Sequence, residues 1–152
     1  MAAETLRRVG WSLIAIGLLD IGLMVYCVTH NLRYDSSFNV FAVAAGIFLL
    51  RQNMRAASVV SFFAAFFLPP AAVAVVLNPL VVPIPIAIEL IAIALIVYVF
   101  WVYRSLTSPA VMEARRAAGV SARTPRLAFV AGVALAVGWA LIILMAWLHI
   151  EW

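Results

Sequence analysis

The sequence predicts an all-α protein, a polytopic bundle of five transmembrane helices with one short interfacial helix. Hydrophobic residues make up 68% of the 152 residues and charged residues only 11%. A soluble domain is about half apolar and a quarter charged, so this composition excludes both an ordinary globular protein and a disordered chain. The apolar residues also form runs long enough to cross a bilayer as helices. We therefore expect a single transmembrane domain over residues 1–152.

The first helix is expected over about residues 6–29. Its arginines, Arg7 and Arg8, followed by an apolar run, are also typical of a signal peptide. The run is long enough to span, however, and no cleavage site of small residues follows it, which favours a retained helix. The second helix, over about residues 37–50, is short for a crossing at ~20 Å.

The third helix is expected over about residues 56–77, with a break or kink at Pro69 and Pro70. Each proline removes a backbone donor, and its ring crowds the preceding turn. Further prolines indicate an irregular turn before the fourth helix, over about residues 84–103.

A short interfacial helix is expected over about residues 109–118, because Ser108 and Pro109 are a capping pair and Gly119 favours a helix end. Thr124 and Pro125 repeat the starting signal before the fifth crossing, over about residues 126–148.

All ten basic residues are arginines. With the N-terminus in the cytoplasm, nine of them fall on the cytoplasmic side and only Arg33 outside, which satisfies the positive-inside rule. The pattern predicts a bacterial cytoplasmic (inner) membrane protein with its C-terminus outside. It also supports a crossing by the short second helix, because without it Arg51 and Arg55 would lie outside. The net charge of +4 does not indicate nucleic-acid binding, since the arginines lie between apolar runs.

Asp20 lies well inside the first helix, where an acid is costly and faces the bundle interior or a wet cavity. It is a candidate proton, cation or counter-charge site, or a buried acid that fixes helix contacts. Glu89 lies near the start of the fourth helix, where the helix dipole favours an acid. With Asn78 beside the interrupted third helix, these two acids form a candidate intramembrane polar site.

His30 and His149 are both expected at the outer interface, where they are weak candidates for a metal or haem site. Neither has a partner at ligand spacing, so we expect exposed interfacial histidines, no metal and no cofactor. Cys27 is the only cysteine, which excludes an internal disulfide and a multi-thiolate site.

The fifth crossing carries a small residue at every fourth position, a ridge that permits close helix packing within the chain or with a partner. These residues are Ala128, Gly132, Ala136 and Ala140. The basic residues around the interfacial helix are candidate contacts for anionic lipid headgroups. They are Arg115, Arg116, Arg123 and Arg126.

Several catalytic motifs are absent, among them GxSxG, HExxH and a glycine-rich phosphate loop. The sequence favours a non-enzymatic integral membrane protein that acts as a homo-oligomer or as a subunit of a larger membrane complex, in contact with membrane lipids. The alternative is a small transporter or channel in which Asp20 is the coupling or selectivity residue. A lipid-modifying enzyme is a third possibility, based on the intramembrane acids and Tyr26.

Overall fold

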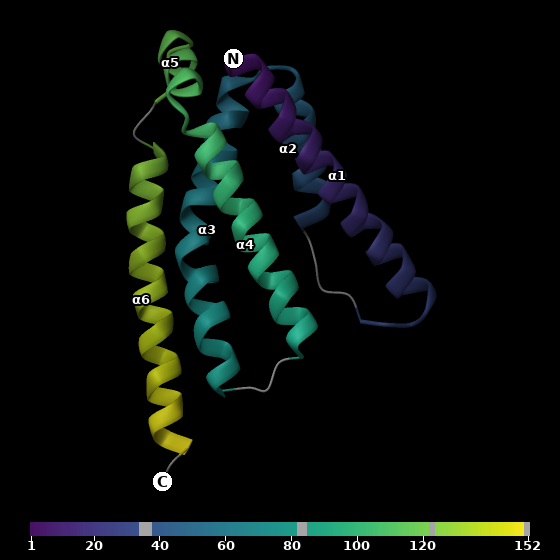
Figure 1. The fold of residues 1–152 in the computed structure, drawn as a ribbon, viewed down its shortest axis with the longest axis vertical. Helices are drawn as coiled ribbons and strands as arrows, with labels where there is room; N and C mark the ends of the chain where they lie inside the picture. The colour runs from purple at the N-terminus through teal and green to yellow at the C-terminus, as the bar shows by residue number, and fades with distance from the viewer. Residues whose placement is uncertain (34–37, 82–84, 122–123, 151–152) are drawn as a thin grey trace. The chain divides into compact units, whose positions relative to one another are not determined.

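A computed structural model of the chain describes residues 1–33, 38–81, 85–121 and 124–150, apart from some side chains near the helix ends. Over these residues it consists of six helices without strands, which confirms the all-α prediction. The helices are α1 (Ala2–Thr29), α2 (Phe38–Leu50), α3 (Met54–Val81), α4 (Ile86–Leu106), α5 (Pro109–Ala117) and α6 (Thr124–Ile150) (Figure 1).

Four of the helices in the described part of the chain are long and apolar enough to cross a membrane, where the sequence predicted five spans. They are α1, α3, α4 and α6. The exception is α2, which has 13 residues. At 1.5 Å per residue it extends over ~20 Å, less than the ~30 Å hydrocarbon core of a bilayer. The protein is therefore a helical membrane protein with one helix of partial length.

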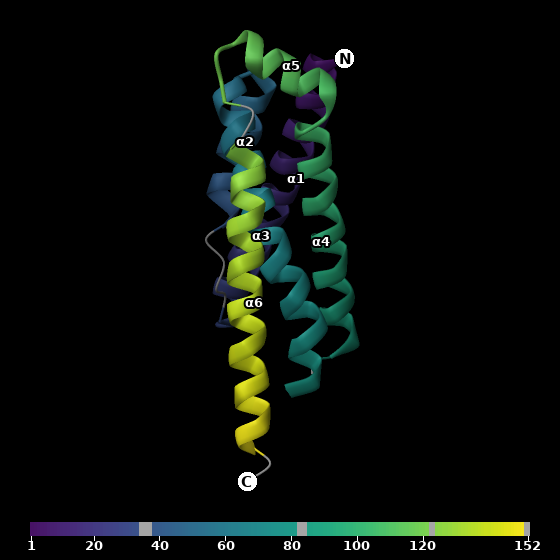
Figure 2. The same ribbon diagram turned by 90° about the vertical axis from the view of Figure 1, so that its left-hand side faces the viewer.

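The chain divides into two compact units. Unit 1 comprises Met1–Ala57 and Ser108–Val120, and unit 2 comprises Ser58–Thr107 and Ser121–Trp152. In unit 1, α1 and α2 run antiparallel and side by side, and α5 lies by the N-terminal end of α1 (Figures 1 and 2). In unit 2, α3 and α4 run antiparallel and α6 follows the direction of α3 (Figure 2).

Of the break or kink that the sequence predicted at Pro69 and Pro70, the break is wrong, because α3 continues through Pro69, Pro70 and Pro79. Each proline removes only the helical hydrogen bond to the carbonyl four residues before it. Prolines are tolerated in membrane helices where neighbouring groups accommodate the freed carbonyl. The two adjacent prolines thus leave the carbonyls of Ala65 and Phe66 without their usual donors while the helix goes on.

The N-terminal end of α3 lies two residues before the predicted start because Asn53 caps it. The Asn53 side-chain oxygen accepts hydrogen bonds from the backbone N–H groups of Arg55 (3.0 Å) and Ala56 (3.2 Å). An asparagine at this position satisfies donors that have no partner within the helix.

The ends of α5 follow the predicted signals. Ser108 is the N-cap residue and Pro109 the first helical residue, although the Ser108 hydroxyl makes no capping bond. After the helix, Gly119 has a φ of +70°, and its N–H donates to the carbonyl of Arg116 (3.0 Å). Glycine adopts this left-handed conformation without a Cβ clash, which explains why the helix ends there.

Candidate functional site

Asp20 lies on the packed face of α1. This face is a stripe of residues with alternating spacings of four and three, the period of a helix seam that stays against a neighbour. Its members are Leu6, Gly10, Leu13, Gly17, Asp20, Met24 and Cys27. The first four are buried, and the last three, from Asp20 onwards, are partly buried. Asp20 therefore stands where the buried part of the stripe ends.

The close approach of α1 and α2 is made by two glycines. A Cβ added at Gly46 would lie 2.6 Å from the carbonyl oxygen of Gly10, and one added at Gly10 would lie 2.9 Å from that of Gly46. Real Cβ atoms do not come this close to a carbonyl oxygen, so the crossing requires glycine on both helices. Small residues allow helix backbones to approach in this way.

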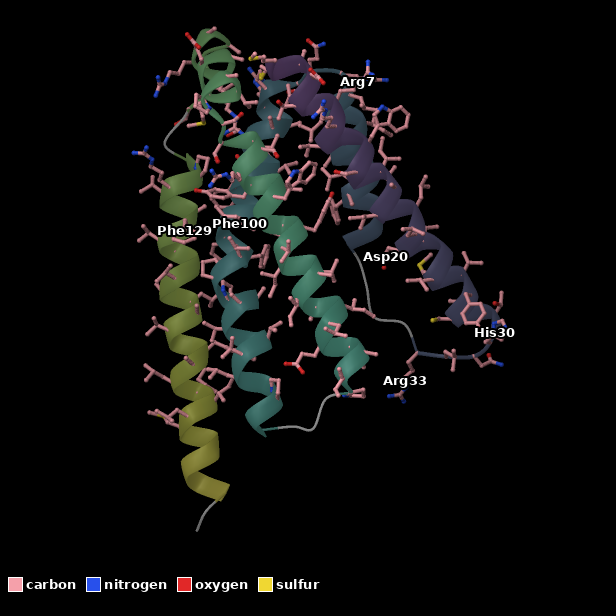
Figure 3. All side chains as sticks on the ribbon, in the orientation of Figure 1. Arg7, Asp20, His30, Arg33, Phe100 and Phe129 are labelled. Atoms are coloured by element: carbon pink, nitrogen blue, oxygen red, sulfur yellow. The ribbon has the colours of Figure 1, made fainter. Side chains whose placement is uncertain are left out.

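The glycine crossing also sets the register of the two helices. Asp20 lies ten residues after Gly10, or ~15 Å along α1, and α2 begins eight residues before Gly46, or ~12 Å back along α2. Because the helices are antiparallel, Asp20 is level with the N-terminal end of α2. Figure 3 shows Asp20 directed from α1 to the side on which α2 begins.

Glu89 lies in the first turn of α4 and is partly buried. It belongs to unit 2, whereas Asp20 belongs to unit 1. Asn78 lies within α3, and its side chain is outside the described part of the structure. A shared polar cavity formed by these three residues therefore stays a prediction.

His30 ends α1 as its C-cap residue and is exposed (Figure 3). Its Nδ1 lies 2.9 Å from the carbonyl oxygen of Tyr26, and the two rings stack with their centroids 4.2 Å apart. The side chain of His149 is outside the described residues. Among the residues that the structure describes, no group of three or more His, Cys, Asp or Glu side chains is placed to hold a metal ion.

The small-residue ridge of α6 contacts α3 within unit 2. Ala128, Gly132 and Ala136 are buried, and Ala140 is partly buried. A Cβ added at Gly132 would overlap the carbonyl oxygen of Phe66. This is one of the two carbonyls freed by the adjacent Pro69 and Pro70, since Phe66 lies four residues before Pro70. The backbone of α6 thus lies against the freed carbonyl, in a place where any Cβ would clash with α3.

Arg115 has a different place from the lipid contact that the sequence predicted. Its side chain is fully buried, and its guanidinium donates a hydrogen bond to the carbonyl oxygen of Ala57 (2.5 Å) in the first turns of α3. Burial lowers the pKa of Arg115 below its usual value, but an arginine keeps its charge at neutral pH. Arg115 faces inward because it follows the buried Val111 by one helical turn. It therefore ties α5 to the start of α3.

The other three candidate lipid contacts differ in how the structure describes them. Arg116 and Arg126 are exposed, whereas Arg123 lies outside the described residues. Contacts of these residues with lipid headgroups stay predictions.

One end of unit 1 is strongly basic, because α2 returns the chain to the N-terminal end of α1. The exposed arginines of α1, of the turn after α2, of the first turn of α3 and of α5 gather there. They are Arg7, Arg8, Arg51, Arg55 and Arg116. Arg8 forms an exposed ion pair with Glu4 (2.6 Å), and such a pair contributes little to stability.

Comparison of the chain with protein-family models, curated proteins and solved structures gives no match. The function is therefore argued from the site itself.

Two features of this site were missed from the sequence although each has a signal there. The stripe from Leu6 to Cys27 alternates in steps of four and three, a pattern that would have identified the packed face of α1 on which Asp20 lies, beyond the expectation from cost alone that Asp20 faces inward. The spacing of Val111 and Arg115 would likewise have placed the arginine on the apolar side of α5. The contact of Gly132 with Phe66 has no such signal, because no local pattern identifies the partner of a glycine.

Proposed function

We propose that this chain is a non-enzymatic integral membrane protein that acts as a homo-oligomer or as a subunit of a larger membrane complex. The observation that supports this most is how little of the spanning helices is covered by the rest of the chain. In α4, only Val102 and Leu106 among the described residues are buried, and both lie in the last two turns. In a membrane, exposed apolar surface of this extent is covered by lipid or by further helices.

We also propose that the basic end of unit 1 faces the cytoplasm, in contact with anionic lipid headgroups. Its exposed arginines fit the positive-inside rule, and guanidinium groups bind phosphate in a bidentate manner. With the short α2 returning the chain and the other four helices crossing, the N-terminus lies inside and the C-terminus outside. A C-terminal reporter that is active only in the cytoplasm would contradict this orientation.

The oligomeric proposal is tested by measuring the mass of the full-length protein in nanodiscs or mild detergent. We expect a mass above the 16.6 kDa of one chain after correction for lipid and detergent, either a multiple of it or a sum with a co-purifying membrane protein. A monodisperse monomer without a partner, purified from its native membrane, would contradict the proposal.

Transport of an ion or small solute is the second candidate function, and the specific observation in its favour is a partly buried acid within a spanning helix. The test is flux into proteoliposomes containing the wild-type protein or Asp20→Asn. Flux that requires the wild-type carboxylate would support this function. Flux that is the same with both proteins would remove Asp20 from the pathway.

A further inference from the structure

The turn between α2 and α3 lies at the basic end of unit 1 and is held by hydrogen bonds. The N–H of Asn53 donates to the carbonyl of Phe48 (3.1 Å), and the N–H of Gln52 donates to the carbonyl of Leu49 (2.9 Å). These two bonds form a Schellman motif, which satisfies carbonyls at the end of a helix. The side chain of Asn53 then caps α3, so only three residues separate the two helices.

Gln52 is an unusual residue for its position in this turn. The Schellman motif places a left-handed residue directly after the helix, and glycine or asparagine is favoured there. Two other helices of the chain end in the same motif, with Asn31 (φ +54°) after α1 and Gly119 (φ +70°) after α5. Gln52 has a φ of +56° in the corresponding place. Its Cβ makes this conformation costly, and its side chain is longer than the short polar group that allows asparagine to adopt it.

The exposed side chains of this turn offer hydrogen-bond donors that the chain itself does not use. Arg51, Gln52 and Arg55 are all exposed. Within the part of the chain that the structure describes, none of these three side chains forms a hydrogen bond or an ion pair, whereas Arg8 is paired with Glu4 (2.6 Å). Two guanidinium groups and an amide therefore stand together on a well-ordered turn, and they suit an anion with several acceptor oxygens.

We propose that Arg51, Gln52 and Arg55 bind the phosphate of an anionic phospholipid, and that Gln52 is kept in its left-handed position because its amide donates to this phosphate. The inference rests on the proposed contact of the basic end with anionic lipid and gives that contact a location. All ten basic residues of the chain are arginines. Lysine would satisfy the positive-inside rule equally well, but the planar guanidinium binds phosphate with two parallel hydrogen bonds, which an ammonium group cannot do.

The test is native mass spectrometry of the full-length protein, titrated with phosphatidylglycerol and, for comparison, with zwitterionic phosphatidylcholine. The wild type should bind its first phosphatidylglycerol more tightly than phosphatidylcholine. Arg51→Lys and Arg55→Lys keep the charge but lose the bidentate geometry, so each should raise the dissociation constant for phosphatidylglycerol by about threefold or more. Arg7→Lys and Arg116→Lys are the matched controls at the same end of unit 1, and each should change it by less than about twofold.

Gln52→Gly separates stability from lipid binding, because the two should change in opposite directions. Glycine adopts the left-handed conformation without a Cβ, so the Tm without added lipid should rise by about 2–4 °C. Loss of the amide should raise the dissociation constant for phosphatidylglycerol about threefold. Asn31→Gly is the control at the same turn position after α1, and it should leave the affinity for phosphatidylglycerol unchanged.

The possible failures have different meanings. Equal affinity of the wild type for the two lipids would overturn the proposed lipid contact, and this inference with it. A preference for phosphatidylglycerol that the Arg7 and Arg116 variants weaken as much as the Arg51 and Arg55 variants would keep the lipid contact but overturn its location at the turn. Unchanged affinity in Gln52→Gly would overturn the role of the amide. Displacement of the bound lipid by excess inorganic phosphate would overturn the assignment to a lipid, since a soluble anion would then be the ligand.

Discussion

Among its described residues each unit contains a close approach of two helix backbones, and the two approaches are built differently. In unit 1 the crossing of α1 and α2 is reciprocal, because Gly10 and Gly46 each make room for the carbonyl of the other. In unit 2 only one side is small, because Gly132 of α6 lies against the Phe66 carbonyl of α3. In unit 2 a proline takes the place of the second glycine. Pro70 has no N–H group, so the Phe66 carbonyl that faces Gly132 is left without its usual hydrogen-bond donor within α3.

The two crossings should differ in how well they tolerate an added methyl group on the glycine. At Gly46 an added methyl group would meet the carbonyl oxygen of Gly10 (2.6 Å), the side chain of Ile14 (2.7 Å) and, less closely, the backbone nitrogen of Ile14 (3.1 Å), and of these the side chain can move. At Gly132 it would meet three backbone atoms of Phe66, which are fixed by the helix on both sides. Packed backbone transmits strain rather than absorbing it. Substitution should therefore be more damaging in unit 2 than in unit 1.

The largest effect is expected for Gly132→Ala. The new Cβ overlaps the Phe66 backbone, so α6 must move away from α3, and overpacking of this kind costs about 2–3 kcal/mol. Thermal unfolding of the protein in nanodiscs should show a Tm lowered by roughly 5–10 °C. Gly138→Ala is the control in the same helix, because nothing lies within 4 Å of a Cβ there. Equal Tm values for the two variants would show that the close approach of α6 and α3 does not exist.

Gly46→Ala should lower the free energy of unfolding by about 1–2 kcal/mol, since Ile14 yields but the Gly10 carbonyl does not. Gly10→Ala should cost less, because its Cβ would be 2.9 Å from the opposite carbonyl rather than 2.6 Å. The measurement is again the Tm, with Gly22→Ala as the control on α1, where a Cβ meets open space. If Gly22→Ala lowers the Tm as much as Gly46→Ala, the loss at Gly46 does not come from the contact with α1. The proposed difference between the two crossings would then be wrong.

Arg115→Met should lower the free energy of unfolding by about 1–2 kcal/mol, because it keeps most of the buried volume but removes the hydrogen bond to Ala57. The loss should appear as faster proteolysis after α5, at the largely exposed residues 118–121, because α5 detaches from the start of α3. Arg116→Met, on the exposed side of the same helix, is the control and should leave the cleavage rate unchanged. Identical rates for both variants would rule out a tethering role for Arg115.

The fold was predictable from the sequence because it depends on local properties. Apolar runs, helix-starting pairs such as Ser108 and Pro109, and helix-ending glycines such as Gly119 act within a few residues, so the six described helices were found close to their observed bounds. The continuity of α3 was not predictable in this way. Prolines weaken a helix locally, but whether it continues depends on how a neighbouring helix accommodates the freed carbonyl.

The candidate site was less predictable than the helices because its contacts, like the continuity of α3, depend on residues that are distant in the sequence. The sequence identified Asp20 and the ridge containing Gly132 by type and spacing, but their partners come from other segments of the chain. The level of Asp20 relative to α2 follows only when the crossing of Gly10 and Gly46 sets the register. Arg115 was assigned to the lipid surface because charged residues usually face outward, whereas its carbonyl partner lies 58 positions away in the sequence.

Pro70→Ala on its own is expected to change the free energy of unfolding least, by less than about 1 kcal/mol. The alanine restores an N–H donor for the Phe66 carbonyl, which is a gain, and at the same time draws that carbonyl back into the helix and away from Gly132. These two changes oppose one another, so the Tm of the single variant should stay close to that of the wild type.

The informative measurement is the double-mutant cycle with Gly132→Ala. If the proline is what turns the Phe66 carbonyl toward α6, Pro70→Ala makes room for the new methyl group, and the double variant should be more stable than the sum of the single changes by about 0.5–1 kcal/mol. Pro79→Ala is the control, since Pro79 frees a different carbonyl in α3 and its replacement should combine additively with Gly132→Ala. Additivity at Pro70 as well would mean that the proline and the glycine act independently, and that the unit 2 crossing depends on one small residue alone.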